Sequence, residues 1–483
     1  PAKTTAKSDV NDLLIIGFIA AHIPVAQALA ISGRFGMIHA GIVFLYGLYA
    51  ALNRKSDRVL YGLGYIAGGE ILWRMTDASI PWEFGKYASI FITGVAILVE
   101  WHARPRSRSQ LISRQAPGTG SPRSLNIFPL IYFFFLIPAM IDTFYIFSLE
   151  EARDKLSFNL SGPLSLAVLS FYLWRRTVTP GQWTNILVAI IAPVAGIAFR
   201  ATYSTLTSEI RFVIDSNPLT SGGFGPNQVS NLLGFGALAG VILILLPQTR
   251  PVLRFVIALT TIWFISQGLL TFSRGGVLSA VITALIFGLH LIRTPQTRVR
   301  ILLLAIVFYA LGTRVILPRL DEFTGGTLQQ RYAEFFVDQD VTGRDDLVNA
   351  DLQAWRDNPI YGVGVGGSLL YHEQHGNAVT AHTEFSRLLA EHGIFGLIAL
   401  LILSGMLISA YFYQRNSTTG QALTAAFAAW AGFTMVQSAM RFVAVSLAIG
   451  LALVIWQELA HPQKDEDTRL INVNHHPARK RGL

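Results

Sequence analysis

The chain has 483 residues, of which 52% are hydrophobic and only 14% are charged. A soluble protein carries roughly a quarter charged residues, so this composition excludes an ordinary soluble fold. The formal net charge of +9 does not indicate nucleic-acid binding, because the Arg and Lys residues cluster in short connections between apolar runs. The chain has no cysteine, which excludes disulfides, thiol catalysis and thiolate metal sites.

Apolar runs long enough to cross a bilayer recur along the chain and predict an all-α polytopic membrane protein with about 14 transmembrane helices. The first run follows two lysines and contains a small-residue pattern like a signal cleavage site. Because the run is long for a signal peptide, we expect an uncleaved first helix. The predicted spans are 12–31, 36–52, 59–73, 87–102, 127–147, 163–174, 184–201, 226–247, 255–272, 277–292, 301–317, 393–413, 422–436 and 442–458.

Basic residues mark every second connection between these spans. If the N-terminus lies inside, each inner connection is basic, and the even number of spans places both termini in the cytoplasm. The inner connections then carry Arg54, Lys55, Arg58, Arg104, Arg106, Arg108, Arg114, Arg123, Arg175, Arg176, Arg250, Arg254, Arg293, Arg298, Arg300 and Arg415.

The same pattern divides the chain into five parts. They are N-terminal membrane helices over 1–182 with a basic cytoplasmic loop at 103–126, membrane helices over 183–317, an outer loop domain over 318–392, C-terminal membrane helices over 393–458 and a cytoplasmic tail over 459–483. The outer loop is the one large soluble piece, and we expect helices at 327–338 and 345–356 within it. Long loops of this kind are usually functional.

Three arginines oppose the positive-inside pattern because they fall on the predicted outer side. Arg200 closes the seventh span, Arg211 follows in the next connection, and Arg274 lies in a tight Gly-rich turn between two spans. A guanidinium group binds oxyanions in a bidentate manner, which suits a diphosphate at the membrane boundary. The alternative is that these side chains reach lipid headgroups or form structural salt bridges.

The second candidate is His382, at the predicted start of a helix that leads into the next span. Phe385, Leu388 and Leu389 mark one apolar face of that helix. A histidine in this place could remove a proton from an attacking hydroxyl near neutral pH. The alternative is a histidine at a helix end that contributes only to the membrane interface.

Two acidic or histidine groups resemble metal sites, but neither is favoured. His372, His375 and His382 lack a convincing carboxylate to complete a metal triad. Asp338 and Asp340 resemble the acidic pair of metal-dependent glycosyltransferases, yet they lie in a polar stretch and are better explained as solvated charges. We therefore expect no metal.

Four further charged residues surround the outer end of the third span. We expect them to pair among themselves and to hold the outer surface together. They are Glu70, Arg74, Glu83 and Lys86.

Three blocks of sequence resemble the O-antigen ligase and polymerase superfamily. The blocks are Ser273-Arg274-Gly275-Gly276 between two spans, Gly343-Arg344 with Trp355, Asn358-Pro359 and Gly362-Val363-Gly364 in the outer loop, and His382 with Gly393 and Gly396. With the spacing of the spans, the resemblance covers residues 183–460. One departure is Thr383, because the family usually has Asn, Ser or Gln after the histidine.

The resemblance implies a GT-C type fold in the bacterial inner membrane, with the active site facing the periplasm. The donor is then an undecaprenyl-diphosphate-linked glycan, and transfer needs neither a metal nor another cofactor. Carried over position by position, Arg274 and Arg200 bind the diphosphate, Arg211 is a reserve, and His382 is the catalytic base. The other candidates for substrate contact are Arg344, Thr383 and Arg387.

The reaction we expect is ligation of the glycan to a lipid A-core acceptor, with inversion. The alternative is a polymerase of the same superfamily that joins lipid-linked repeat units of O-antigen or exopolysaccharide. A distant alternative is a lipid-glycan transporter, but transporters more often show internal repeats and charged residues in mid-span. The expected partners are the lipid-linked donor, a lipid A-core or glycan acceptor and the bilayer, without nucleic acid.

Overall fold

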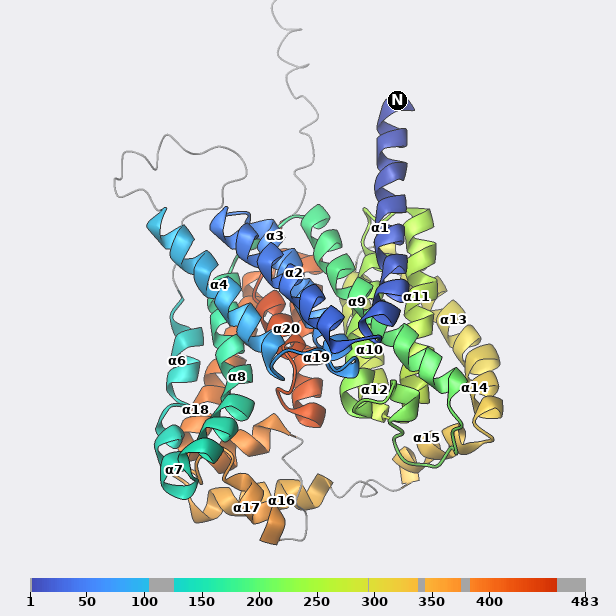
Figure 1. The fold of residues 1–483 in the computed structure, drawn as a ribbon. Coiled ribbons are helices and arrows are strands. Elements are labelled where there is room, and N and C mark those ends of the chain that lie inside the picture. Colours follow the sequence, from blue (N-terminus) through green and yellow to red (C-terminus); the bar gives the residue numbers. More distant parts are fainter. Residues whose placement is uncertain (1, 104–125, 294, 338–343, 375–382, 458–483) are drawn as a thin grey trace, which may run out of the picture.

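The computed structural model describes residues 2–103, 126–293, 295–337, 344–374 and 383–457, and within them the chain is helical except for two short strands (Figure 1). The first half contains α1 (Ala2–Leu29), α2 (Gly33–Leu52), α3 (Ser56–Met75), α4 (Phe84–His102), α6 (Phe128–Phe134), α7 (Pro138–Ile146), α8 (Leu149–Leu173), β1 (Thr177–Val178), α9 (Pro180–Thr207), the 3-10 turn η1 (Leu219–Ser221) and α10 (Pro226–Leu245).

The second half begins with α11 (Pro251–Leu270), α12 (Arg274–Leu291) and α13 (Pro295–Leu311). It continues through the π-helical stretch η2 (Gly312–Ile316), α14 (Leu317–Phe323), α15 (Thr327–Val337), α16 (Arg344–Asp357), α17 (Ser368–Gln374), α18 (Glu384–Tyr413), α19 (Thr418–Ser438), α20 (Ala444–Ala452) and β2 (Ile455–Trp456). The helices expected within the outer loop are thus present as α15 and α16.

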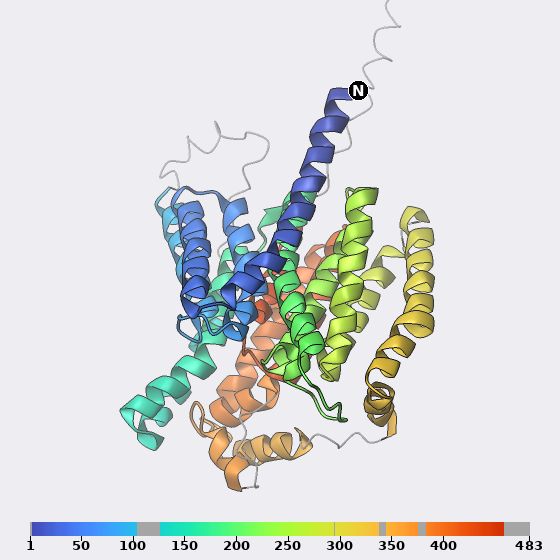
Figure 2. The ribbon, with the colours of Figure 1, turned by 45° about the vertical axis from the view of Figure 1, so that its right-hand side comes forward.

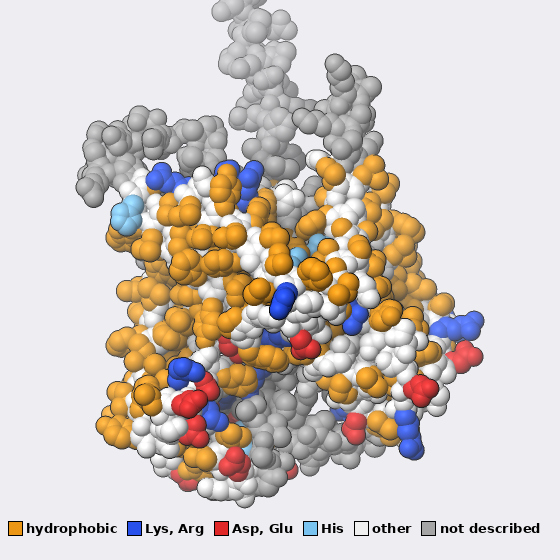
Figure 3. All heavy atoms as spheres, in the orientation of Figure 1, with side chains coloured by type: hydrophobic (Ala, Val, Ile, Leu, Met, Phe, Trp, Pro, Cys, Tyr) orange, Lys and Arg blue, Asp and Glu red, His pale blue; other side chains and the backbone are white. Residues whose placement is uncertain are grey.

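Eleven helical segments of the described residues are long and apolar enough to cross a membrane, so the chain is a multi-pass, all-helical membrane protein. Figure 3 shows hydrophobic side chains covering much of the visible face of the bundle, while charged side chains gather towards its two ends. Two ends can therefore be named. The loop end carries α14 to α17, and the opposite end carries the end of α2 and the start of α9 (Figures 1 and 2). It is called the basic end because Arg54 and Lys55 follow α2 and Arg176 precedes α9.

Three of the 14 predicted spans are not among these eleven segments. The span at 59–73 is α3, whose buried Glu70 and Arg74 reduce its apolar character. The span at 422–436 is α19, which is long but rich in Ala and Thr. The span at 442–458 contains α20, which has nine residues and covers about 14 Å, too short for a hydrocarbon core of about 30 Å. The full count of 14 therefore stays a prediction.

The centre of the bundle is closely packed because small residues let the helices approach. A Cβ atom at Gly68 of α3 would lie 2.5 Å from the carbonyl oxygen of Ile190 in α9. Aromatic pairs fill the wider spaces: Phe235 stacks on Trp430 with ring centroids 4.2 Å apart, joining α10 to α19. The result is a rigid frame that fixes the helix ends on which the polar residues described below lie.

The basic end is closed by a small structural device. Thr177 and Val178 of β1 pair in parallel with Ile455 and Trp456 of β2. Beside them, Arg176 donates to both carboxylate oxygens of Glu100 at 2.9 Å. This ion pair connects the end of α4 to the segment that leads through β1 into α9, far from the loop end.

Candidate functional site

The turn between α11 and α12 projects Arg274 at the loop end. Phe272 adopts a left-handed conformation (φ 56°), and α12 begins at Arg274. The hydroxyl of Ser273 does not cap α12; it donates to Oδ1 of Asn227 on α10 at 2.8 Å. A Cβ atom at Gly276 would collide with the Ser230 backbone of α10, so glycine is needed here. A turn between the two predicted spans is thus present, but it precedes Arg274, and Gly275 and Gly276 lie in the first turn of α12.

The helix α15 at the loop end packs directly on this turn. Leu328 is buried with Phe272 in a small apolar cluster separate from the main core. On α15, Arg331 is 6% exposed, and its Nε donates to the carbonyl oxygen of Phe272 at 3.2 Å. In return, Nη1 of Arg274 donates to the carbonyl oxygen of Arg331 at 3.4 Å. The two arginines are therefore held side by side.

Arg211 is brought to the same turn by its neighbour in the sequence. Phe212 stacks on Phe272 with centroids 6.0 Å apart, and it also meets Phe323 of α14 edge-on at 5.5 Å. The side chain of Arg211 itself is exposed. Two of the three predicted diphosphate-binding arginines, Arg211 and Arg274, thus lie on one structural unit.

Arg200 lies in a different setting. The sequence predicted a span ending at 201, but α9 continues to Thr207, so Arg200 lies about two turns inside the helix. Its Nη1 donates to Oε1 of Gln27 on α1 at 3.1 Å, and its guanidinium lies over the ring of Tyr203. Residues 201–207 continue the helix beyond the predicted end of the span. Arg200 is therefore not the last residue of this helix, as the sequence had predicted.

The four charged residues around the end of α3 pair with one another, as predicted. Arg74 contacts Glu70 at 2.7 Å and Glu83 at 3.5 Å, and Lys86 contacts Glu83 at 2.6 Å. All four are at most 7% exposed. They therefore lie inside the loop end, and the expectation that they hold the outer surface together stays a prediction.

This buried group is connected to the helices on either side. Nη1 of Arg74 donates to Oε1 of Gln228 on α10 at 3.2 Å and to the carbonyl oxygen of Arg441 at 3.0 Å. The backbone N–H of Val443 donates to Glu70 at 2.6 Å. The short connection between α19 and α20 is therefore tied to α3. A cavity of about 180 Å³ lies beside this group, with Trp73 and Trp82 in its wall.

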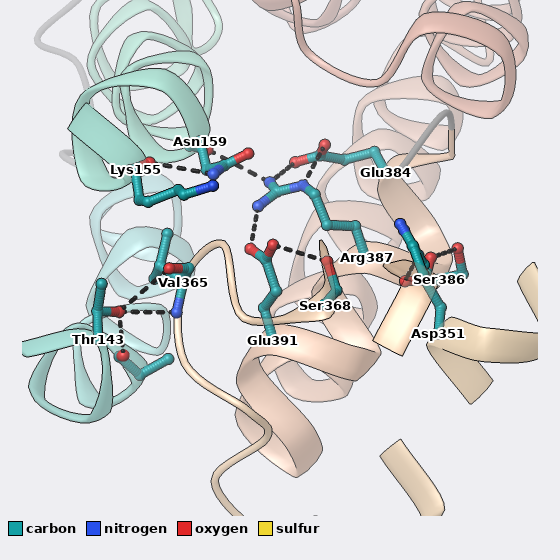
Figure 4. A network of polar contacts seen from close by, with 12 residues as sticks. Thr143, Lys155, Asn159, Asp351, Val365, Ser368, Glu384, Ser386, Arg387 and Glu391 are labelled. Carbon is teal, nitrogen blue, oxygen red and sulfur yellow. Dashed lines mark hydrogen bonds and ion pairs between the residues drawn. The ribbon is translucent and has the colours of Figure 1, made fainter. Parts of the chain in front are cut away.

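The first turns of α18 carry a second buried charged group, shown in Figure 4. Arg387 donates to Glu384 on one side and to Glu391 on the other, each at 2.5 Å. Glu391 also accepts from the hydroxyl of Ser368 at 3.1 Å. Of the face predicted to be apolar, Leu388 is fully buried while Phe385 is 36% exposed; the charged side chain of Arg387, next to Leu388 in the sequence, is also buried, at 2% exposed. Pairing among the charged residues makes this burial possible.

The helix α16 at the loop end is attached to α18 by a buried acid, Asp351. One carboxylate oxygen of Asp351 accepts from the hydroxyl of Ser386 at 2.5 Å, and the other bonds Nε2 of His372 at 2.8 Å. Backbone bonds add to this attachment where Gly393 (φ 58°) breaks the α18 helix, since the N–H of Val363 donates to Ala390. The start of α18 is thus fixed by α16 and α17.

Several predicted site residues fall at the edges of this arrangement. His382 lies outside the described residues, as do His375 and the pair Asp338 and Asp340. Thr383 precedes α18 as its N-terminal boundary residue and has an extended backbone. The α16 helix begins at Arg344. Within the described residues, no group of three or more His, Cys, Asp or Glu could hold a metal ion.

Sequence reasoning missed three residues that the structure brings to these groups. They are Arg331, Asp351 and Arg441. Arg331 is one of several outer-loop arginines, and the sequence gives no sign that it is buried while Arg319 is exposed. Arg441 falls between α19 and α20 and its guanidinium lies over the ring of Phe158 at 4.2 Å. A basic residue on the predicted outer side was the one available signal for Arg441.

The fold and these groups define a class: a multi-pass membrane protein that holds buried arginines at one end, together with a half-buried Arg274 beside a buried turn. Residues 259–401 match the family model described as O-Antigen ligase. The family comprises membrane glycan transferases of the ligase and polymerase type. The resemblance seen in the sequence is thereby confirmed. No curated protein sequence matches the chain significantly.

Proposed function

We propose that the chain is a ligase that transfers a glycan from undecaprenyl diphosphate to a lipid A-core acceptor. The reaction takes place on the periplasmic face of the inner membrane, with both termini of the chain in the cytoplasm. The observation that carries the proposal is the position of Arg274. It lies within the matched range, at the first turn of α12, and beside Arg331 on the outer segment.

The chemistry follows from what these groups can do. The acceptor hydroxyl attacks the anomeric carbon, the bond from that carbon to the diphosphate breaks, and the electron pair stays on the leaving diphosphate. His382 takes the proton of the hydroxyl as general base. The guanidinium groups of Arg274 and Arg200, with Arg211 in reserve, stabilise the negative charge that grows on the diphosphate. Attack from the opposite face inverts the anomeric configuration.

The outer segment completes the site in this proposal. Residues 318–392 cover the diphosphate end of the donor and exclude water, and Thr383 and Arg344 contact the substrate near His382. The undecaprenyl chain lies against the apolar helix faces. No metal takes part, because the arginines neutralise the leaving group.

The proposal is tested by transfer in nanodiscs, with a lipid-linked glycan as donor and lipid A-core as acceptor. The substitution Arg274→Lys keeps the positive charge but loses the planar guanidinium group, so donor binding weakens and the rate of transfer falls by about 30- to 1,000-fold. His382→Ala keeps donor binding and loses roughly 100-fold or more in turnover. The matched control is His102→Ala, an exposed histidine near the basic end, which leaves transfer unchanged.

The acceptor decides between the two types of transferase. If glycan is joined to lipid A-core, the chain is a ligase; if it is joined only to a second lipid-linked glycan, the polymerase alternative is correct. Transfer by His382→Ala at the parental rate would remove His382 from the mechanism. Absence of transfer to either acceptor would overturn the proposal as a whole.

A further inference from the structure

Arg331 is a buried cation whose hydrogen-bonding capacity is only partly used. Its Nε is satisfied by Phe272. Its Nη1, however, has no hydrogen-bond partner among the described residues and makes a long ion-pair contact of 4.0 Å with Asp215, whose side chain is 88% exposed. A buried polar atom without a partner costs free energy. An acceptor from outside the described residues would satisfy it.

The next residue, Tyr332, shows the same property. Its hydroxyl is buried and has no hydrogen-bond partner within the part of the chain that the structure describes. Burial raises the pKa of Tyr332 well above its ordinary value, and the positive charges of Arg274 and Arg331 oppose that rise. The phenol is therefore neutral at physiological pH and available as a donor. An anion beside the two arginines is the acceptor that matches it.

The surroundings of these two side chains are preformed. Leu328 and Phe272 fix α15 against the turn, and Tyr332 packs on the same apolar cluster. The first turn of α12, which begins at Arg274, adds backbone N–H groups and the positive end of an 18-residue helix. The positive charges of Arg274 and Arg331 and the neutral phenol of Tyr332 thus lie close together beside the start of α12.

We propose that Arg331 and Tyr332 bind the diphosphate of the lipid-linked donor together with Arg274, so that α15 closes the donor site from the outer side. Arg331 supplies a second guanidinium from a different segment, and Tyr332 donates its hydroxyl to a phosphate oxygen. This inference rests on the proposed function, since it assumes a diphosphate-bearing donor. It assigns the outer segment a direct part in donor binding.

Tyr332→Phe is the sharper test, because it removes one oxygen atom that has no partner in the structure. A buried hydroxyl without a hydrogen-bond partner does not stabilise the fold, so the thermal stability of the variant in detergent stays at or above the parental value. Binding of farnesyl diphosphate, measured by calorimetry, falls about 10-fold or more, since a hydrogen bond to a charged group is lost. The control is Tyr361→Phe, an exposed phenol of the same segment.

Arg331→Lys provides a second measurement. The lysine keeps the charge but cannot bond Phe272 and the phosphate at once, so farnesyl diphosphate binds about 10- to 100-fold more weakly. The control is Arg319→Lys on α14, whose side chain is 79% exposed and pairs with Glu322. Inorganic pyrophosphate in excess competes with farnesyl diphosphate if the diphosphate group is what is recognised. Farnesyl monophosphate binds clearly more weakly than farnesyl diphosphate.

The outcomes separate this inference from the proposed function. If the parental protein binds farnesyl diphosphate and transfers glycan, but Tyr332→Phe and Arg331→Lys bind it as the parental protein does, the inference is wrong and the transferase proposal stands. If farnesyl monophosphate binds as tightly as the diphosphate, recognition of a diphosphate is wrong. If the parental protein neither binds farnesyl diphosphate nor transfers glycan, both proposals fall.

Discussion

Replacing Arg387 by Met should destabilise the fold more than it impairs chemistry. The guanidinium of Arg387 donates to Glu384, Glu391 and the carbonyl oxygen of Asn159. Both carboxylates are 1% exposed, so Arg387→Met leaves two buried acids without their shared cation. Removing one partner from a buried ion pair costs about 3–5 kcal/mol. We expect a loss of that order in the free energy of unfolding.

The assay is equilibrium unfolding in mixed SDS and maltoside micelles. Arg415→Met is the matched control, because Arg415 lies just beyond the other end of α18 and is exposed; its effect should stay within about 0.5 kcal/mol. The double variant Arg387→Met with Glu391→Gln removes one of the stranded charges. It should therefore be more stable than the sum of the single effects predicts, by roughly 0.5–3 kcal/mol.

The alternative for Arg387 is a substrate contact, as its position near His382 in the sequence suggests. In that case Arg387→Met would unfold like the parental protein and like Arg415→Met, yet would lose transfer. Such a result would refute the reasoning from burial. A variant that loses stability in proportion to its loss of activity supports the structural role.

Two further predictions concern metal and topology. Transfer should continue in excess EDTA, because guanidinium groups neutralise the leaving diphosphate; loss of transfer that Mg²⁺ or Mn²⁺ restores would move Asp338 and Asp340 into the mechanism. Single cysteines can be introduced cleanly, since the chain has none. In spheroplasts, a membrane-impermeant maleimide should label Asp346→Cys at the loop end but not Asn53→Cys at the basic end, both exposed positions; the opposite pattern would invert the proposed orientation.

Much of the fold could be predicted because membrane-spanning helices leave a direct record in the sequence. Eleven of the predicted spans correspond to apolar helices. The limits appear where tertiary pairing replaces hydrophobicity. Glu70 and Arg74 are buried in α3 because they neutralise each other, and the end of α9 was misplaced because residues 201–207 remain helical although they are more polar. Hydropathy alone carries neither kind of information.

The candidate site was predictable in part for a similar reason. Arg274 stands out because a basic residue in a Gly-rich turn on the predicted outer side opposes the topology bias. Arg331 and Asp351 do not stand out, since nothing in a polar loop distinguishes a buried charge from an exposed one. Only the packing of α15 on Phe272 distinguishes the buried Arg331 from the exposed Arg319. In the same way, only the packing of α16 on α18 shows that Asp351 is buried. Contacts between distant segments decide which loop residues matter.

The buried arginines of the loop end differ in how their donors are used, and this difference argues for different roles. Arg387 has two carboxylates and a carbonyl oxygen as acceptors, so the cost of its burial is offset within the chain. Arg331 is buried to a similar extent, but one of its terminal nitrogens has no acceptor among the described residues. An uncompensated buried donor lowers stability unless something outside the chain binds it. The arrangement at Arg331 is therefore best explained by an anion that arrives with the substrate, whereas the arrangement at Arg387 is complete without one.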